Sequence, residues 1–142
     1  MKRVKAPRMD VVFENIVEAI GWTPLVRLFN VERYFNVRNM LFAKLEAFNP
    51  GGSIKDRIAV YMLDRAEKEG KIVRGSVIIE PTAGNTGIGL AIVCRVRGYR
   101  CVFILPEKMS LEKELLLRSL CSLIVRTPIE ASPDSPLSYY YV

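Results

Sequence analysis

The sequence predicts an α/β fold in which a parallel sheet carries helices on both faces, so that the lobe has three layers. Short apolar, β-branched stretches alternate with helical patterns in the order strand, helix, strand, helix, strand, helix, strand, and such alternation is typical of parallel sheets covered by helices. Gly70 and Gly98 stop two of the helical patterns. Half of the 142 residues are hydrophobic, which is enough to build one core.

Each element follows from its own local pattern. Residues 11–19 place apolar side chains at helical spacing, and Gly21-Trp22-Thr23-Pro24 interrupts them. Residues 40–48 alternate apolar and charged side chains, as strands do, whereas residues 31–37 fit neither pattern. Together the patterns predict helices over 11–19, 53–69, 86–96 and 110–120, and strands over 25–28, 40–48, 77–79, 101–105 and 123–126.

The helix over 53–69 carries the strongest signals. Ser53 is suited to cap its N-terminus, and Asp56 stands three residues later in the capping-box position. Apolar residues four apart predict its buried stripe, namely Ile54, Ile58, Met62 and Ala66.

Two glycine-containing loops follow predicted strands that end near Phe48 and Ile79. Right-handed crossovers place the loops after parallel strands at one edge of the sheet, and open α/β sheets bind ligands at that edge. We therefore expect both loops to contribute to one ligand site.

Several classes of function are excluded or disfavoured. The chain has no histidine, which excludes Ser/His/Asp and Cys/His catalysis within it and argues against a metal site. The net charge of +6 is dispersed, so we expect a solvated surface and no nucleic-acid partner. No apolar run is long enough for a bilayer, so no membrane partner is expected. Cys94, Cys101 and Cys121 lack CxxC spacing and are expected to be buried free thiols of a cytoplasmic protein.

The first loop places Lys55 in the first turn of a helix. The positive end of the helix dipole disfavours an ammonium there and so favours the free amine, the form that attacks an aldehyde. The preceding Gly51 and Gly52 let another molecule approach the backbone closely. A solvated lysine on an amphipathic helix is the alternative interpretation of these features.

The second loop, from Glu80 to Gly87, is a strand-to-helix turn rich in small polar residues. Backbone N–H groups at a helix N-terminus bind carboxylates and phosphates, and Thr82, Asn85 and Thr86 add side-chain donors. The loop has neither the GxGxxG pattern nor a P-loop lysine, which disfavours nucleotide binding. An ordinary capped turn is the alternative.

The combination of the two loops is far more specific than either alone. Asn-Pro-Gly-Gly-Ser-Ile-Lys-Asp-Arg at 49–57, followed by Glu-Pro-Thr-Ala-Gly-Asn-Thr-Gly-Ile-Gly-Leu-Ala at 80–91, resembles the cysteine synthase and cystathionine β-synthase family. Residues 20–28, 98–101, 106–110 and 125–128 extend the resemblance across nearly the whole chain. It implies the smaller lobe of a two-domain pyridoxal-phosphate enzyme fold.

The resemblance also implies roles for individual residues. Lys55 corresponds to the lysine that binds pyridoxal 5'-phosphate covalently and later takes the Cα proton of the substrate. Asn85 corresponds to the asparagine that hydrogen-bonds the cofactor ring hydroxyl. The loop that binds the carboxylate of the amino-acid substrate corresponds to Thr82, Ala83, Gly84, Asn85 and Thr86. The implied reaction is β-replacement on serine or O-activated serine, in which sulfide gives cysteine and homocysteine gives cystathionine.

The sequence departs from the family pattern at three places. Ala83 replaces a serine of the carboxylate loop, and Cys121 replaces a helix-ending glycine. The loop that holds the cofactor phosphate in the family has no counterpart between Pro128 and Val142. We therefore expect residues 1–40 to be an N-terminal segment of the larger domain, 41–130 the lobe with the cofactor lysine, and 131–142 a truncated tail.

Two functional hypotheses follow. The first is an enzyme of this family, forming a homodimer or associating with a second lobe. The second is a truncated, noncatalytic α/β chain that acts only by binding a partner.

Overall fold

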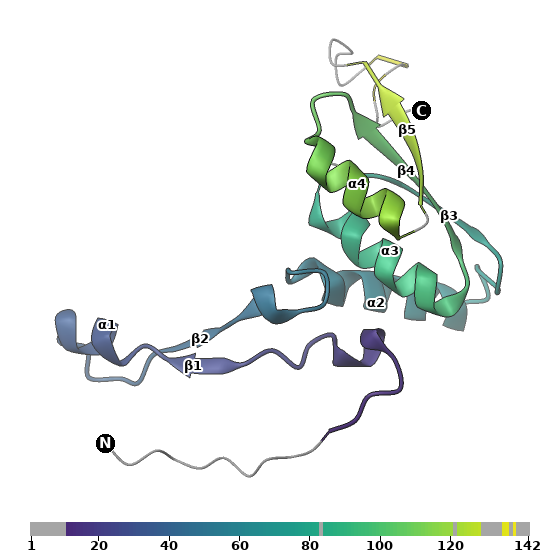
Figure 1. Cartoon of the computed structure of the whole chain (residues 1–142). Helices are drawn as coiled ribbons and strands as arrows, with labels where there is room; N and C mark the ends of the chain where they lie inside the picture. Colours follow the sequence, from purple (N-terminus) through teal and green to yellow (C-terminus); the bar gives the residue numbers. More distant parts are fainter. Residues whose placement is uncertain (1–10, 83, 121, 129–134, 137, 139–142) are drawn as a thin grey trace.

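The computed structural model describes residues 11–82, 84–120, 122–128, 135–136 and 138. Its central feature is a parallel sheet of β3 (Val77–Pro81), β4 (Arg100–Pro106) and β5 (Leu123–Thr127), in the order β3-β4-β5. The helix α3 (Asn85–Arg97) connects β3 to β4, and α4 (Leu111–Ser119) connects β4 to β5. Figure 1 shows α3 and α4 side by side in front of this sheet, with α2 (Lys55–Lys68) next to α3. The predicted α/β class and the parallel sheet are confirmed.

The N-terminal part forms an arm that extends away from this sheet (Figure 1). The arm consists of the strands β1 (Leu25–Arg27) and β2 (Phe42–Lys44) and the helix α1 (Phe29–Tyr34), and the short 3-10 helix η2 (Glu46–Phe48) follows β2. The 3-10 helix η1 (Ile16–Ala19) precedes the arm and packs against α3, with Val17 in the core. The predicted helix over 11–19 is thus reduced to the turn of η1. Asn15 explains where η1 begins, because its side chain accepts a hydrogen bond from the Val17 N–H.

The ambiguous segment 31–37 contributes to α1, which a single side chain connects to β1 and to the residue just before β2. The buried carboxylate of Glu32 binds Arg27 at 2.8 Å and accepts a hydrogen bond of 2.7 Å from the Leu41 N–H. The hydrogen bond with Arg27 lowers the pKa of Glu32. The partners of Glu32 lie five and nine residues away, outside the helix itself, and local periodicity therefore did not indicate the helix.

The prediction that residues 40–48 begin the parallel sheet is wrong. Only 42–44 form a strand, β2, and it pairs with β1 in antiparallel orientation, with Val26 opposite Ala43. The Leu28 N–H also donates to the Leu41 carbonyl at 2.9 Å. Alternation of side chains predicts a strand but not its partner, so the pattern could not separate a strand of this antiparallel pair from a fourth parallel strand.

The core is built around α3, whose residues from Gly87 to Cys94 are all buried. Cys101, Phe103 and Leu105 of β4 face it from the sheet. On the opposite face of the sheet, Val77 and Ile79 of β3 and Leu123 and Val125 of β5 are exposed. Within the described residues, the helices that pack on the sheet, α3 and α4, therefore cover one face, and the predicted second helical layer is not formed.

The helix α2 buries a different stripe from the predicted one. Asp56, Ala59 and Leu63 are its buried residues, whereas Ile54, Ile58 and Met62 are exposed. The reason is close packing of two helices through small residues. A Cβ atom at Gly89 of α3 would lie 3.0 Å from Asp56 Cα, 3.1 Å from the Lys55 carbonyl oxygen and 3.2 Å from Ala59 Cβ. Apolar spacing predicts that the stripe with the bulkiest side chains is buried. In α2 the contact with α3 is instead made by Ala59 and by the backbone of Lys55 and Asp56.

Within the part of the chain that is described, no helix combines the length and the apolar character needed to cross a membrane.

The close approach of α2 and α3 predicts the effect of a side chain at position 89. We expect Gly89→Val to lower the free energy of unfolding by about 1 to 3 kcal/mol, because the new atoms meet backbone that cannot move aside. The matched control is Arg95→Val, which places the same β-branched residue at an exposed position of the same helix. Urea denaturation of both variants checks this, and equal losses of stability would contradict it.

Candidate active site

The loop 49–54 leads into α2 and places Lys55 at its first helical residue. The Ser53 hydroxyl accepts a 3.0 Å hydrogen bond from the Lys55 N–H, and Gly52 adopts φ +77°, where other residues are strained. The Lys55 side chain is exposed, and its amine has no hydrogen-bond or ion-pair partner in the described part of the chain. The amine is thus available to a ligand.

Asp56 does not complete the predicted capping box with Ser53. Its carboxylate instead accepts a hydrogen bond from the Gly51 N–H, two residues further back. The approach is so close that a Cβ atom at Gly51 would lie 2.4 Å from Asp56 Oδ1. Burial raises the pKa of Asp56, and Oδ1 has no hydrogen-bond partner among the described atoms. Glycine at 51 is therefore required by Asp56, and the pair fixes the loop just before Lys55.

A second set of contacts ties this loop to the segment between η1 and β1 through Asn49. The side chain of Asn49 is buried, with 4% exposed. Its Oδ1 accepts a 2.9 Å hydrogen bond from the Gly21 N–H, and its Nδ2 donates to Glu46 Oε2 at 2.9 Å. Segments 28 residues apart in the chain are thus held together at the start of the loop.

Glu46 and Arg57 form the centre of these contacts. The Arg57 Nε and Nη2 atoms bind the two carboxylate oxygens of Glu46 at 2.8 and 3.0 Å, a two-point geometry that gives strong, oriented pairs. Arg57 Nη2 also donates to the Gly21 carbonyl at 3.0 Å, and the Thr23 hydroxyl donates to Glu46 at 3.1 Å. The hydrogen bond with Arg57 is the largest cause that lowers the pKa of Glu46 to about 2. We call Gly21, Thr23, Glu46, Asn49 and Arg57 the arginine cluster.

Local sequence patterns did not indicate that Thr23, Glu46 or Asn49 contributes to the site. All three lie inside or beside the motifs quoted for the resemblance. The sequence signal for Asn49 was its place next to the Pro-Gly-Gly turn. Its partner Gly21 lies 28 residues away, too far for residue spacing to reveal the contact.

The second loop begins where β3 ends, and Thr82 is its buried anchor. The Thr82 N–H donates to the Ile104 carbonyl at 3.1 Å, and its Oγ1 accepts a 3.3 Å hydrogen bond from the Gly84 N–H. A Cβ atom at Gly87 would lie 2.5 Å from Thr82 Cγ2. The Thr82 side chain thus packs beneath the first turn of α3 and shapes the loop from inside.

The other residues predicted for this loop lie at the N-terminus of α3. Gly84 is the N-cap, no side chain of the described residues caps the helix there, and a Cβ atom at Gly84 would meet open space. Asn85 is exposed and Thr86 is half-buried. Ala83 falls outside the described residues. The uncapped first turn has N–H groups without partners in the helix, and it carries the positive end of the helix dipole.

Helix packing, and not the edge of one sheet, brings the two loops together. Asn85 and Gly89 are four residues apart on α3 and therefore share one face, and Gly89 lies against the backbone of Lys55 and Asp56. The predicted arrangement of both loops at the carboxyl edge of one sheet is wrong in this respect, because β2 belongs to the antiparallel pair. The predicted proximity of the loops agrees with this packing.

These groups fit pyridoxal phosphate. Lys55 offers an exposed amine for the cofactor aldehyde, Asn85 offers an amide, and the open space at Gly52 and Gly84 leaves room for a ring beside the backbone. The donors at the α3 N-terminus suit a carboxylate.

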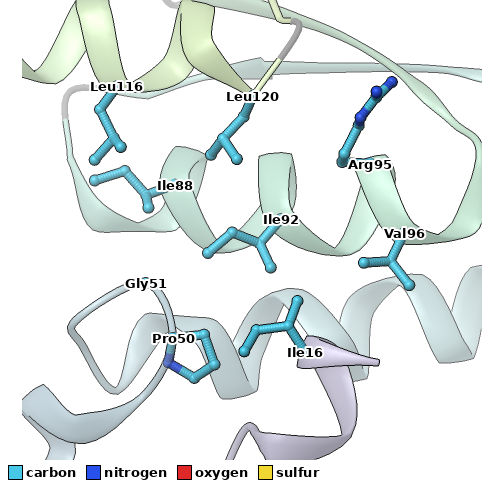
Figure 2. Close-up of a pocket in the computed structure, with 9 residues that line it drawn as sticks. All are labelled: Ile16, Pro50, Gly51, Ile88, Ile92, Arg95, Val96, Leu116 and Leu120. Atoms are coloured by element: carbon cyan, nitrogen blue, oxygen red, sulfur yellow. The ribbon is translucent and has the colours of Figure 1, made fainter. Parts of the chain in front are cut away.

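A separate apolar cavity of about 330 Å³ lies between η1, the loop at 50–51, α3 and α4 (Figure 2). Isoleucine and leucine side chains dominate its lining, and Arg95 stands at its rim. Neither Lys55 nor the second loop lines it, so it is distinct from the candidate active site.

The family profile of pyridoxal-phosphate dependent enzymes matches residues 16–140, and the chain belongs to this family. It is 50% identical over 135 residues to a cystathionine beta-synthase of Oryctolagus cuniculus, covering 95% of this chain and 24% of that protein. It is 52% identical over 115 residues to a cysteine synthase of Staphylococcus aureus, covering 81% of this chain and 36% of that protein. The predicted resemblance is thereby confirmed.

Solved structures agree. A hydrogen sulfide-producing enzyme from Fusobacterium nucleatum matches with a TM-score of 0.77 and 42% identity over 84% of this chain and 39% of that one. An O-acetylserine dependent cystathionine beta-synthase from Helicobacter pylori matches with a TM-score of 0.74 and 42% identity, over 83% and 39% respectively. The chain spans about a quarter of the length of the first curated relatives, 24% and 28%.

The low pKa of Glu46 predicts how the arginine cluster responds to acid. Because its pKa falls from 4.5 to about 2 on folding, its contribution to stability is complete above pH 4.5 and is lost as the pH falls towards 2. We expect the stability difference between the wild type and Glu46→Gln to shrink across this window. Urea midpoints measured at stepped pH values check this.

The matched control is Glu112→Gln, which neutralises an exposed carboxylate outside the arginine cluster. A difference between the wild type and Glu46→Gln that stays constant from neutral pH to 2 would contradict the assignment.

Proposed function

We propose that the chain supplies the cofactor lysine and the substrate-carboxylate loop of an enzyme that performs pyridoxal-phosphate-dependent β-replacement. The substrate is serine or an O-activated serine, and the product is cysteine or cystathionine. One observation carries this proposal. The unpaired, exposed amine of Lys55 lies at the start of α2, which Gly89 holds directly against α3, one turn from Asn85. The names of the relatives agree with this chemistry.

In this proposal Lys55 has two tasks. Its amine binds the cofactor covalently, and after substrate binding the same amine takes the proton from the substrate Cα. The cofactor, when bound, supplies an electron sink for the negative charge left on that carbon. Contacts of Asp56 and of the arginine cluster hold the loop 49–54 in place. The backbone of Lys55 is therefore fixed, which limits the positions that its amine can take relative to the cofactor and the substrate.

The α3 N-terminus orients the substrate. Its free N–H groups and the Thr86 hydroxyl bind the carboxylate, while Asn85 hydrogen-bonds the cofactor ring hydroxyl. Thr82 holds the start of this loop through its contacts with Gly84 and Gly87. Since Ala83 lacks the hydroxyl of the family's serine, the carboxylate loses one hydrogen bond, which is worth about 1.5 to 3 kcal/mol for a charged acceptor.

The boundaries at 40 and 130, a homodimer and a cytoplasmic location belong to the same proposal. A second candidate is a noncatalytic chain that binds a partner. The exposed apolar residues Val77, Ile79 and Leu123 on the uncovered face of the sheet favour it. A chain that folds and binds no cofactor would support this second candidate.

The proposal predicts that Lys55 alone captures the cofactor. After incubation with pyridoxal phosphate and reduction with borohydride, the wild type should retain one covalent cofactor on the peptide with Lys55. The Lys55→Ala variant should retain none there. Visible absorbance before the reduction and peptide mass spectrometry after it measure this.

Lys68→Ala is the matched control, since Lys68 is an exposed lysine at the other end of α2. It should label as the wild type does. Equal labelling of several lysines, or labelling that survives Lys55→Ala, would contradict the assignment of Lys55.

A further inference from the structure

The apolar cavity between η1, α3 and α4 has no part in the proposed reaction. Its volume is about 330 Å³, and small-molecule sites typically have volumes of about 300 to 1,000 Å³. Branched aliphatic side chains line it from three elements or their ends, namely Ile16, Ile88, Ile92, Val96, Leu116 and Leu120. None of the lining residues among the described part of the chain is aromatic. Such a wall suits a flexible alkyl chain better than a planar ring, which gains from aromatic neighbours.

The cavity is open to solvent along one side. Ile16, Val96 and Leu116 line it and yet keep 52%, 41% and 44% of their surface exposed. Ile88 and Ile92 are buried and close the opposite side. Removal of apolar surface from water is favourable. A ligand that covers the exposed side chains therefore gains free energy without any opening of the core.

A second, polar cavity of about 290 Å³ adjoins the first. Arg95 and Leu120 line both cavities, and Arg100 lines the polar one. Figure 2 shows the Arg95 side chain extending from α3 away from Ile16 and Pro50. Its aliphatic stem therefore borders the apolar cavity, and its charged group lies beyond the apolar lining.

The two arginines of the polar cavity are available to a ligand. Both are exposed, and neither guanidinium group has a hydrogen-bond or ion-pair partner within the described residues. The Tyr99 hydroxyl, also at this cavity, donates to Glu67 at 2.7 Å, and Arg97 binds the same carboxylate at 3.1 Å. This carboxylate is therefore already paired. A guanidinium group binds a carboxylate through two parallel hydrogen bonds, so a ligand carboxylate is the natural partner of Arg95.

We propose that the two cavities together bind a medium-chain aliphatic carboxylate, that is, a fatty acid. Its alkyl chain lies between η1, α3 and α4, and its carboxylate binds Arg95, with the charge of Arg100 close by. Pro50 and Gly51 also line the apolar cavity, and the Gly51 N–H donates to the Asp56 carboxylate. A bound alkyl chain packs against this turn and holds that hydrogen bond closed. The ligand thus stabilises the loop before Lys55 from outside the candidate active site.

Calorimetric titration of the full chain with decanoate, below its micelle concentration, tests the site. We expect one saturable site per chain. Leu116→Trp should abolish this binding because the indole ring fills the cavity, and Ile16→Trp should do the same from a different element. The matched control is Leu115→Trp, which adds the same ring at a neighbouring residue of α4 that is 56% exposed and does not line the cavity. It should bind decanoate as the wild type does.

The absence of saturable binding would overturn the proposal. Equal affinity in Leu115→Trp and Leu116→Trp would overturn it too, because decanoate would then be bound elsewhere on the chain. Both tryptophans replace residues with exposed side chains, so the urea midpoints of the two variants should agree.

The role of the charge is tested with decanol and with Arg95→Gln. Loss of either the carboxylate or the guanidinium group should weaken binding about tenfold, since a charge-assisted contact is lost. The control is Arg38→Gln, which removes an exposed arginine of the arm outside both cavities and should leave the affinity unchanged. Equal affinities for decanoate and decanol in the wild type would contradict the carboxylate site.

Amide hydrogen exchange tests the link to the loop. Saturating decanoate should slow exchange of the Gly51 amide in the wild type and leave it unchanged in Leu116→Trp. An unchanged Gly51 rate in the saturated wild type would show that the ligand does not stabilise this loop.

Discussion

The ion pair between Arg57 and Glu46 is the interaction on which the candidate site depends. Its two contacts of 2.8 and 3.0 Å join α2 to η2, and Arg57 and Asn49 also hydrogen-bond Gly21, in the segment between η1 and β1. An arginine in two-point contact with a carboxylate has little freedom to rotate. The loop between Glu46 and Arg57 is therefore held in one conformation. The backbone of Lys55 has a defined position although its side chain is exposed.

A second constraint is the absence of side chains where two helices meet. Gly89 lets α3 approach the backbone of Lys55 and Asp56, and Gly51 lets Asp56 reach the loop. The ion pair restrains the loop that leads into α2, and the glycine contacts hold α2 against α3. Together they bring the backbone of Lys55 to within one helical turn of the N-terminus of α3, where no described side chain caps the helix, an arrangement that suits the proposed aldehyde cofactor and carboxylate substrate.

The positions of the helices and strands along the sequence were predicted far better than the elements that each of them pairs with or packs against. The helices near 53–69, 86–96 and 110–120 and the strands β3, β4 and β5 all lie within a few residues of their predicted bounds, because periodicity and glycine stops are local signals. The place of β2 and the buried face of α2 were wrong, since both are decided by long-range contacts. Lys55 and Asn85 were predicted as site residues from their motifs, whereas Glu46 and Asn49 act through partners that no spacing reveals.

The most direct test of this account is amide hydrogen exchange in Arg57→Ala, compared with Arg65→Ala, which removes an exposed ion pair from the same helix. We expect Arg57→Ala to speed exchange at Gly21 and Gly51 together, by tenfold or more, which corresponds to about 1.4 kcal/mol of lost local stability. Arg65→Ala should leave both amides unchanged. Unchanged exchange at Gly51 in Arg57→Ala would show that the ion pair does not hold the loop before Lys55, and the central claim would fail.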